Sequence, residues 1–112
     1  LQWRVLPDDV LKLSSVVCSS IQHLEFTECN LSDELLPLIL SCFVNVKNLN
    51  LSKKKFRVIP ECIKECRFLT TLSLDYSYRL LEIRWIPTNL KYFSALECPN
   101  LTSSSKSMLL NQ

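Results

Sequence analysis

A spaced pattern of apolar residues occurs four times in this chain, and it constrains the fold more than any other feature. Each copy reads ΦxxΦxΦ, where Φ is apolar, and the copies begin at Ile21, Val46, Leu69 and Leu90. Successive copies therefore start 25, 23 and 21 residues apart. One copy would mean little in a leucine-rich chain, but four copies in register indicate an internal repeat.

The spacing is typical of leucine-rich repeats, whose units span roughly 20–29 residues. The alternating ΦxΦ segment predicts a short strand with one apolar face toward the core and one polar face outward. Stacked units form a parallel sheet, which needs a crossover segment between successive strands. We therefore predict an α/β fold. It is a leucine-rich repeat solenoid, a horseshoe segment with short parallel β-strands on its concave face and helical or extended crossovers.

The repeats divide the chain into three parts. Residues 1–20 are expected to hold part of a preceding repeat with an inserted polar loop at 14–20. Residues 21–102 hold the four leucine-rich repeat units, which start at 21, 46, 69 and 90. Residues 103–112 are expected to form a polar C-terminal tail that includes a short helix.

Two crossover segments share the pattern ΦPxxΦxxΦ, at residues 6–13 and 59–66. Proline suits the first turn of a helix, because its missing N–H would have no partner there. Both segments therefore predict a helical turn. Ile86 and Pro87 recur before Leu90, but only two residues separate Pro87 from Leu90, so this crossover is predicted to be extended.

The crossover after the first unit predicts a longer helix. Ser32 is a candidate N-cap, and Asp33 and Glu34 fall in the first turn, where the helix dipole favours carboxylates. Apolar residues then recur at three- and four-residue spacing from Leu35 to Val46. This spacing is typical of an amphipathic helix.

An inward-facing position follows each strand, and such repeats usually place Asn or Cys there. Cys29 and Cys98 fit this position, where they would satisfy buried backbone groups. Ser77 holds it in the third unit and Lys54 in the second. We expect the amine of Lys54 to point outward, unless the turn is remodelled there.

Composition excludes several classes of function. The chain has no glycine, so it contains no Walker A loop, no dinucleotide-binding GxGxxG motif and no kinase glycine loop. Thirteen basic and eleven acidic residues give a net charge of +2, which indicates neither a nucleic acid nor a membrane partner. A single histidine leaves little room for a histidine-based metal site.

The cysteines admit two interpretations. An even count of six in a short chain is compatible with a disulfide framework. The chain does not open on a signal peptide, however, and most cysteines stand where the repeat has apolar residues. We therefore expect reduced residues of the core. They are Cys18, Cys29, Cys42, Cys62, Cys66 and Cys98.

Two possible pairings of reactive residues are weak evidence for a catalytic or a metal site. His23 is expected on the polar side of its strand and Cys29 inward, so they do not form a nucleophile pair. Cys62 and Cys66 have metal-ligand spacing, but Cys66 replaces a core leucine in the crossover pattern. We therefore expect no catalytic residue and no metal site. The basic run 53–57 has the composition to contact a phosphate or an acidic partner, yet such runs are typical of a solvated turn.

Stacking the units aligns their polar positions in columns across the sheet, about 4.8 Å apart from strand to strand. Tyr76 is the best candidate anchor for a partner, because an aromatic side chain offers large contact area at low entropic cost. The alternative is that Glu28 and Lys53 merely pair on a solvated face. The candidate partner-binding residues are, column by column, Glu25, Asn50, Ser73 and Ser94; Thr27, Ser52, Asp75 and Leu96; Glu28, Lys53, Tyr76 and Glu97.

Four segments extend the repeat pattern to a family resemblance. They are LSDELLP at 31–37, VIPECIKECRFL at 58–69, IPTNLKYFSA at 86–95 and CPNLT at 98–102. From about residue 6 to residue 112 the chain resembles the leucine-rich repeat region of plant TIR-NBS-LRR disease resistance proteins. The similarity is to the group called tobacco mosaic virus resistance protein N-like, especially its legume members.

The resemblance implies a sensor module of an intracellular immune receptor. In that family a TIR domain signals and can cleave NAD, and a central domain binds ADP or ATP. The repeats detect pathogen effectors and restrain the resting receptor. None of the TIR or nucleotide-binding motifs stands in this chain, so the resemblance implies neither an enzyme nor a cofactor here. The implied partners are a pathogen effector or guarded host protein and the receptor's own nucleotide-binding domain. The implied location is cytoplasmic or nucleocytoplasmic.

Two other classes of repeat protein remain open from the residues. Extracellular leucine-rich repeat receptors run near a regular 24 residues and carry glycine before Ile-Pro, whereas Val58 precedes Ile59 here. The substrate-binding repeats of a ubiquitin-ligase adaptor are the other alternative. An F-box-like segment before the repeats would identify that class.

Overall fold

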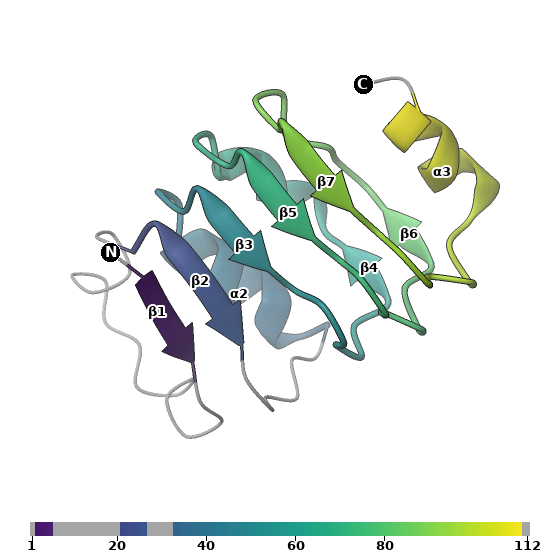
Figure 1. Cartoon of the computed structure of the whole chain (residues 1–112), viewed down its shortest axis with the longest axis horizontal. Coiled ribbons are helices and arrows are strands. Elements are labelled where there is room, and N and C mark those ends of the chain that lie inside the picture. Colours follow the sequence, from purple (N-terminus) through teal and green to yellow (C-terminus); the bar gives the residue numbers. More distant parts are fainter. Residues whose placement is uncertain (1, 6–20, 27–32, 111–112) are drawn as a thin grey trace.

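Parallel strands form the main sheet of this chain. The computed structural model describes residues 2–5, 21–26 and 33–110 of the 112 (Figure 1). Within these ranges the sheet has five strands, ordered as they follow one another along the stack. They are β1 (Gln2–Val5), β2 (His23–Phe26), β3 (Asn48–Asn50), β5 (Thr71–Ser73) and β7 (Tyr92–Ser94).

The strand register confirms the alignment of the repeat units. Glu25 pairs with Asn50, Asn50 with Ser73 and Ser73 with Ser94. The middle residues of β3 and β5, Leu49 and Leu72, point inward and are buried. The parallel α/β stack is thus confirmed, whereas a horseshoe curvature stays a prediction for a longer array.

Strand β1 is an element that the sequence analysis did not identify. It pairs in parallel with β2, and Trp3 stands opposite Leu24. The signal was the alternation of Trp3 and Val5, which lie in register with Leu24 and Phe26. The sequence has no position three residues before Trp3 for the first apolar residue of the ΦxxΦxΦ pattern, and a lone ΦxΦ is too short to detect by spacing alone.

The crossover segments lie behind the main sheet (Figure 1). They contain α2 (Leu35–Cys42), β4 (Val58–Ile59), the 3₁₀ helix η2 (Glu61–Glu65) and β6 (Glu82–Ile83). The helical turn predicted for 59–66 is therefore present, as a 3₁₀ helix that follows Pro60. The segment 6–13, which shares its pattern, lies outside the described residues, as does the predicted loop at 14–20.

Strands β4 and β6 pair in parallel as a small second sheet, which places Ile59 opposite Ile83. In the sequence, the recurring Ile-Pro pair aligns Ile59 with Ile86. In the structure the strand partner of Ile59 is Ile83, three residues earlier in the chain. Between β6 and β7 there is no helix, so the predicted extended crossover before Leu90 is confirmed.

Helix α2 starts later than the sequence predicts. It begins at Leu35, so Asp33 and Glu34 precede the helix and its first turn holds no acidic residue. The predicted role of these carboxylates in the first turn is wrong. Asp33 instead accepts hydrogen bonds from the backbone N–H groups of Arg57 (2.7 Å) and Val58 (3.2 Å), in the next unit. The candidate cap Ser32 lies outside the described residues.

The apolar residues of both layers meet in one core between the sheet and the crossovers. Its largest fully buried side chains include Phe43 and Phe56, and α2 contributes Leu36, Ile39 and Leu40. In the described ranges no helix has the length and apolarity that crossing a membrane requires.

The C-terminal tail, which was predicted to be polar, is hydrogen-bonded to the preceding part of the chain. It forms helix α3 (Ser103–Leu110), beside β6 at the end of the stack (Figure 1). The buried Ser105 hydroxyl accepts a hydrogen bond from the N–H of Ile83 at 2.9 Å. The N–H of Thr102 donates to the carbonyl of Leu81 at 2.8 Å. These contacts satisfy backbone groups of Ile83 in β6 and of Leu81 just before it, with which no further strand pairs in the described chain.

Candidate interaction surface

The polar face of the main sheet carries the residues predicted to contact a partner. Thr27 and Glu28 lie outside the described residues. The third column is exposed at Lys53, Tyr76 and Glu97. The first column is half-buried and comprises Glu25, Asn50, Ser73 and Ser94.

Hydrogen bonds between side chains tie neighbouring units together across this face. The hydroxyls of Ser52 and Ser73 lie 2.7 Å apart. Oδ1 of Asp75 accepts hydrogen bonds from the Ser94 hydroxyl at 2.5 Å and from the N–H of Leu96 at 2.8 Å. These polar side chains, predicted as candidate partner contacts, therefore also link neighbouring units. The inter-unit spacing brings short polar side chains within reach of each other, which sequence spacing alone does not reveal.

A shallow hollow of about 280 Å³ lies over β2, β3 and β5. On the β2–β3 side of the hollow, Asn48 and His23 are hydrogen-bonded to each other. Thr71 and Ser73 of β5 line its other side. His23 thus has an asparagine partner, and among the described residues no group of three or more metal-ligand side chains gathers. The hollow offers amide, hydroxyl and imidazole groups for polar contacts.

Asp75 allows a direct test of the bonds between units. Asp75→Ala is expected to lower the free energy of unfolding by about 1.5–3 kcal/mol, because two donors in the fourth unit lose a charged acceptor. Asp75→Asn keeps an oxygen at this place and should recover most of the loss. Urea unfolding of both variants measures the difference. Equal losses in the two would contradict the acceptor role.

The turns that follow β3, β5 and β7 share an unusual backbone conformation. Lys53, Tyr76 and Glu97 have φ angles of 60°, 60° and 56° and occupy equivalent positions. The N–H of Lys53 donates to the carbonyl of Asp75 at 2.9 Å, and that of Tyr76 to the carbonyl of Leu96 at 2.7 Å. These inter-unit bonds hold a conformation that glycine usually adopts, in a chain that has no glycine.

Glycine at these positions should stabilise the fold. Lys53→Gly and Glu97→Gly are each expected to raise the free energy of unfolding by about 0.5–1 kcal/mol. A positive φ costs a residue with a Cβ roughly 1–2 kcal/mol, and the greater unfolded-state entropy of glycine offsets part of this gain. Lys55→Gly is the matched control, because Lys55 has no positive φ, and it should lose about 0.5–1 kcal/mol. Urea titration measures all three, and a loss at Lys53 and Glu97 would contradict the strain.

The inward positions after β3, β5 and β7 support the stack through hydrogen bonds to the unit before each of them. Cys98 Sγ donates to the carbonyl of Leu74 at 3.1 Å, and the Ser77 hydroxyl to that of Leu51 at 3.4 Å. Lys54 Nζ donates to the equivalent carbonyl of Phe26 at 2.9 Å. Three chemically different donors therefore serve equivalent carbonyls.

The expectation that Lys54 points outward is wrong. Lys54 is only 8% exposed. The turn is not remodelled either, because Lys53 before it has the same positive φ as Tyr76 and Glu97 in the other units. The physical reason is the reach of the lysine stem, which can bury its methylene groups and still bring the amine to a carbonyl. The sequence analysis named the position but had no means to judge this reach.

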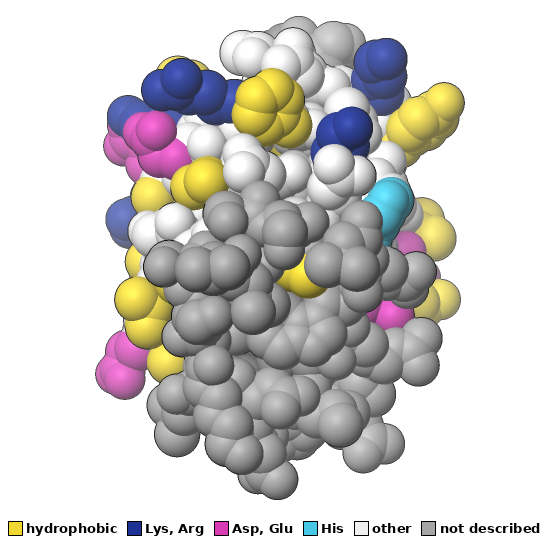
Figure 2. Space-filling model, turned by 90° about the vertical axis from the view of Figure 1, so that its left-hand side faces the viewer, with side chains coloured by type: hydrophobic (Ala, Val, Ile, Leu, Met, Phe, Trp, Pro, Cys, Tyr) yellow, Lys and Arg dark blue, Asp and Glu magenta, His cyan; other side chains and the backbone are white. Residues whose placement is uncertain are grey.

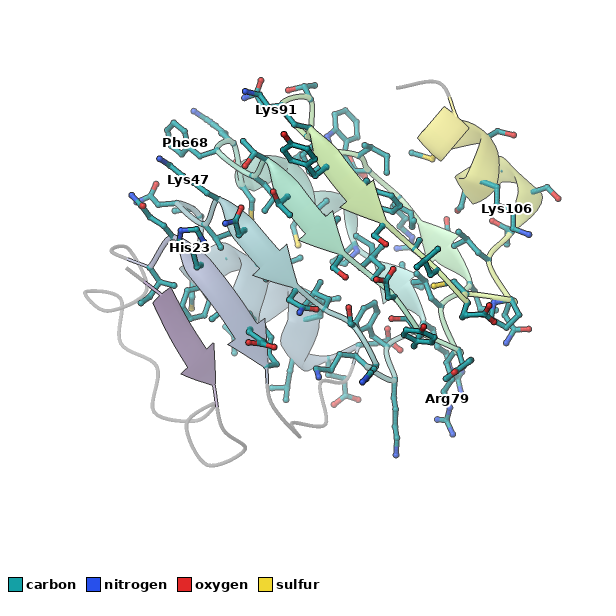
Figure 3. All side chains as sticks on the ribbon, in the orientation of Figure 1. His23, Lys47, Phe68, Arg79, Lys91 and Lys106 are labelled. Atoms are coloured by element: carbon teal, nitrogen blue, oxygen red, sulfur yellow. The ribbon has the colours of Figure 1, made fainter. Side chains whose placement is uncertain are left out.

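Because the Lys54 side chain points inward, its amine is separated from the exposed cations of the basic run 53–57. Lys53 and Lys55 stay exposed and, with Tyr76, Tyr78 and Arg79, line an open hollow of about 660 Å³. Arg79 lies at the edge toward which the strands run, as Figure 3 shows. Tyr78 and Arg79 were not predicted as site residues, although they follow Tyr76 closely in the sequence.

A third hollow, of about 560 Å³, lies at the opposite edge of the sheet, where the strands begin. Lys47, Phe68 and Lys91 are gathered at this edge in Figure 3. Thr70 and Asn89 also line it, and the Asn89 side chain donates to the carbonyl of Arg67 at 2.9 Å. The sequence analysis missed this edge, because its columns did not include the residues just before the strands, such as Lys47, Thr70 and Lys91.

The described cysteines are all free thiols. Cys66 and Cys98 are buried, and Cys42 and Cys62 are half-buried against the core. Cys18 and Cys29 lie outside the described residues. Burial raises the pKa of the Cys66 thiol to about 11, with a smaller contribution from Cys62. Burial also raises the pKa of Cys98. These thiols are therefore neutral near pH 7, which suits a role in packing.

The raised pKa of Cys66 predicts a loss of stability in alkali. The neutral thiol is favoured by the fold, so its contribution is complete below pH 9 and is lost as the pH rises from 9 toward 11. We expect a loss of about 1–2 kcal/mol over this interval. Cys66→Ala should be less stable throughout but lack this part of the pH dependence. Urea unfolding at several pH values measures it, and parallel curves for both proteins would contradict the assignment.

Comparison with known proteins places the chain in a family. Residues 9–108 match the family described as "Disease resistance protein RPS4B-like, leucine-rich repeats". No curated protein and no solved structure gives a significant match. The family match spans nearly the whole chain and agrees with the repeat register, the parallel strands and the predicted resemblance to resistance-protein repeats. The chain therefore belongs to the leucine-rich repeats of RPS4B-like disease resistance proteins.

Proposed function

We propose that this chain is a protein-interaction module of an intracellular plant immune receptor. In this role it contributes to the recognition of a pathogen effector or guarded host protein, and it restrains the receptor at rest through contact with the nucleotide-binding domain. The observation that most supports this proposal is the polar face of the sheet, whose strands are paired in register. The exposed side chains of Lys53, Tyr76 and Glu97 border this face. Family membership supports the immune context.

The chemistry of this face supports binding more than catalysis. It presents hydroxyl, amide and charged groups on rigid strands, together with exposed apolar side chains such as Leu96 and Tyr92. Mixed polar and aromatic surfaces of this kind suit protein partners. Repeat proteins generally bind partners across the face that their stacked units share.

The same proposal extends to the receptor that would contain these repeats. It is a TIR-NBS-LRR protein of the tobacco mosaic virus resistance protein N-like, legume type. In it ADP or ATP would bind the nucleotide-binding domain and any NAD cleavage would belong to the TIR domain. The repeats themselves would act without a cofactor and without enzymatic activity. Their location would be cytoplasmic or nucleocytoplasmic, as for the intracellular receptors that the chain resembles.

The test is made in the full-length receptor, expressed in leaves. Leu96→Arg and Thr71→Arg place a bulky charge on the sheet face at positions whose side chains make no hydrogen bond among the described contacts. We expect either spontaneous cell death, from lost restraint, or loss of the effector-triggered response.

Leu38→Arg is the matched control. Leu38 is 59% exposed on α2 behind the sheet, and Leu96 is 60% exposed on its front. Receptor levels are compared by immunoblot, so that unfolding is recognised. Normal restraint and normal triggering in both face variants would refute the proposed function. A response to Leu38→Arg equal to that of Leu96→Arg would do the same.

A further inference from the structure

The hollow at the carboxyl edge of the sheet combines three cations with two aromatic rings. We call it the basic–aromatic hollow, lined by Lys53, Lys55, Tyr76, Tyr78 and Arg79. Lys54 also borders it, but its amine is committed to the carbonyl of Phe26. We infer that this hollow binds an acidic peptide segment of a protein partner. The inference rests on the proposed function and names the chemistry of its partner.

The charges of the hollow are uncompensated within the described chain. None of its lining residues is acidic. The ion pairs found among the described residues lie elsewhere, between Lys64 and Glu61 and between Arg84 and Glu82. Asp75 lies nearby in the sequence, but its Oδ1 is occupied by Ser94 and Leu96. Three cations that share one hollow favour a ligand with several carboxylates.

The aromatic wall distinguishes this hollow from an ordinary solvated turn. The rings of Tyr76 and Tyr78 lie 6.4 Å apart at a tilt of 53°. Both are exposed, Tyr78 by 57%. Exposed tyrosines that pack on each other offer contact area with few rotatable bonds, which is typical of the energetic centre of a protein interface.

The backbone of the hollow is held in place before any partner arrives. Lys53 and Tyr76 both adopt a positive φ of 60°, and an inter-unit hydrogen bond fixes each. Such strained residues persist only when their surroundings determine them, and they cluster at binding sites. A fixed rim lowers the entropic cost of binding an extended segment.

A peptide suits this hollow better than a nucleic acid. The net charge of the chain is only +2, and a polyanion would need a long cationic stripe. In the view from the N-terminal end of the stack, both basic and acidic side chains are visible among the described residues at the margins of this face (Figure 2). The three cations are local to one hollow of about 660 Å³, a size that accepts a few side chains of a peptide.

The test measures binding to a fluorescein-labelled peptide of about twelve residues, rich in Glu and Asp, by fluorescence anisotropy with the 112-residue chain. We expect saturable binding that weakens as NaCl rises from about 50 to 300 mM. Lys55→Glu combined with Arg79→Glu should weaken it at least about tenfold. Tyr78→Ala should weaken it about fivefold, and Tyr78→Phe should retain most of the affinity.

Lys106→Glu is the matched control, because Lys106 is an exposed cation on α3, away from the hollow (Figure 3). It should change affinity less than about twofold. Circular dichroism establishes that each variant is folded. No binding of the peptide would overturn the inference, and so would an equal loss in Lys106→Glu.

Two further probes separate other anions from a peptide. Tighter binding of a single-stranded oligonucleotide than of the acidic peptide would overturn the inference in favour of a nucleic acid. Full displacement of the peptide by millimolar pyrophosphate would overturn it in favour of a small-anion site. If peptide binding fails while Leu96→Arg still alters the receptor response, only this inference falls. If the hollow binds the peptide but the leaf assay is unaffected, only the proposed function falls.

Discussion

Leu49→Asp is expected to unfold the chain, with a loss of about 5 kcal/mol or more in the free energy of unfolding. Leu49 is the middle residue of β3, 2% exposed, and it faces the core between the sheet and α2. A carboxylate there has no partner and would have to be buried charged or be protonated at a cost. Typical domains have only about 5–15 kcal/mol of stability in all. Circular dichroism and gel filtration measure the outcome.

Asn50→Asp is the matched control for this substitution. Asn50 is the next residue of β3 and points to the polar face, where its Oδ1 accepts a hydrogen bond from the N–H of Ser52 at 3.0 Å. Aspartate retains that oxygen, so the change should cost less than about 1 kcal/mol. Equal effects at both positions would contradict the assignment of inward and outward faces.

Phe56→Ala is expected to lower the free energy of unfolding by about 3–5 kcal/mol. Phe56 is fully buried in the core, and it lies in the chain segment between β3 and β4. Removal of the ring leaves a cavity that rigid neighbouring units can fill only in part. The midpoint of urea unfolding should fall while the slope stays constant.

Phe68→Ala provides the comparison at a surface position. Phe68 is 56% exposed and borders the hollow at the edge where the strands begin. Its loss should change stability by less than about 0.5–1 kcal/mol. If Phe56→Ala costs no more than Phe68→Ala, the assignment of Phe56 to the core is wrong.

The strands and their register could be predicted from the sequence because the repeat is carried by side-chain spacing. Ile21, Val46, Leu69 and Leu90 recur at the same place in each unit, and the parallel pairing follows from stacking them. The extended crossover before Leu90 was predictable for the same kind of reason, since too few residues remain for a helix. Family membership also agrees with what these patterns indicate.

The candidate surface could be predicted only in outline. Periodicity identifies which residues leave the core, but it does not show what they contact. The hydroxyl of Ser94 and the carboxylate of Asp75 are nineteen positions apart and become partners only when the units stack. The hollow that joins Lys55 to Arg79 likewise spans two units.

The sequence by itself determined the repeat, the parallel order of the strands and the inward and outward faces, because spacing along the chain sets the direction of each side chain. Only the tertiary structure decided the position of the Lys54 amine, the pairing of Ile59 with Ile83 and the binding of Asp33 to the next unit. Each of these depends on distances between units that are brought together by packing. The energy of a buried amine or carboxylate depends on which carbonyl or N–H comes within reach, and local sequence does not specify that neighbour.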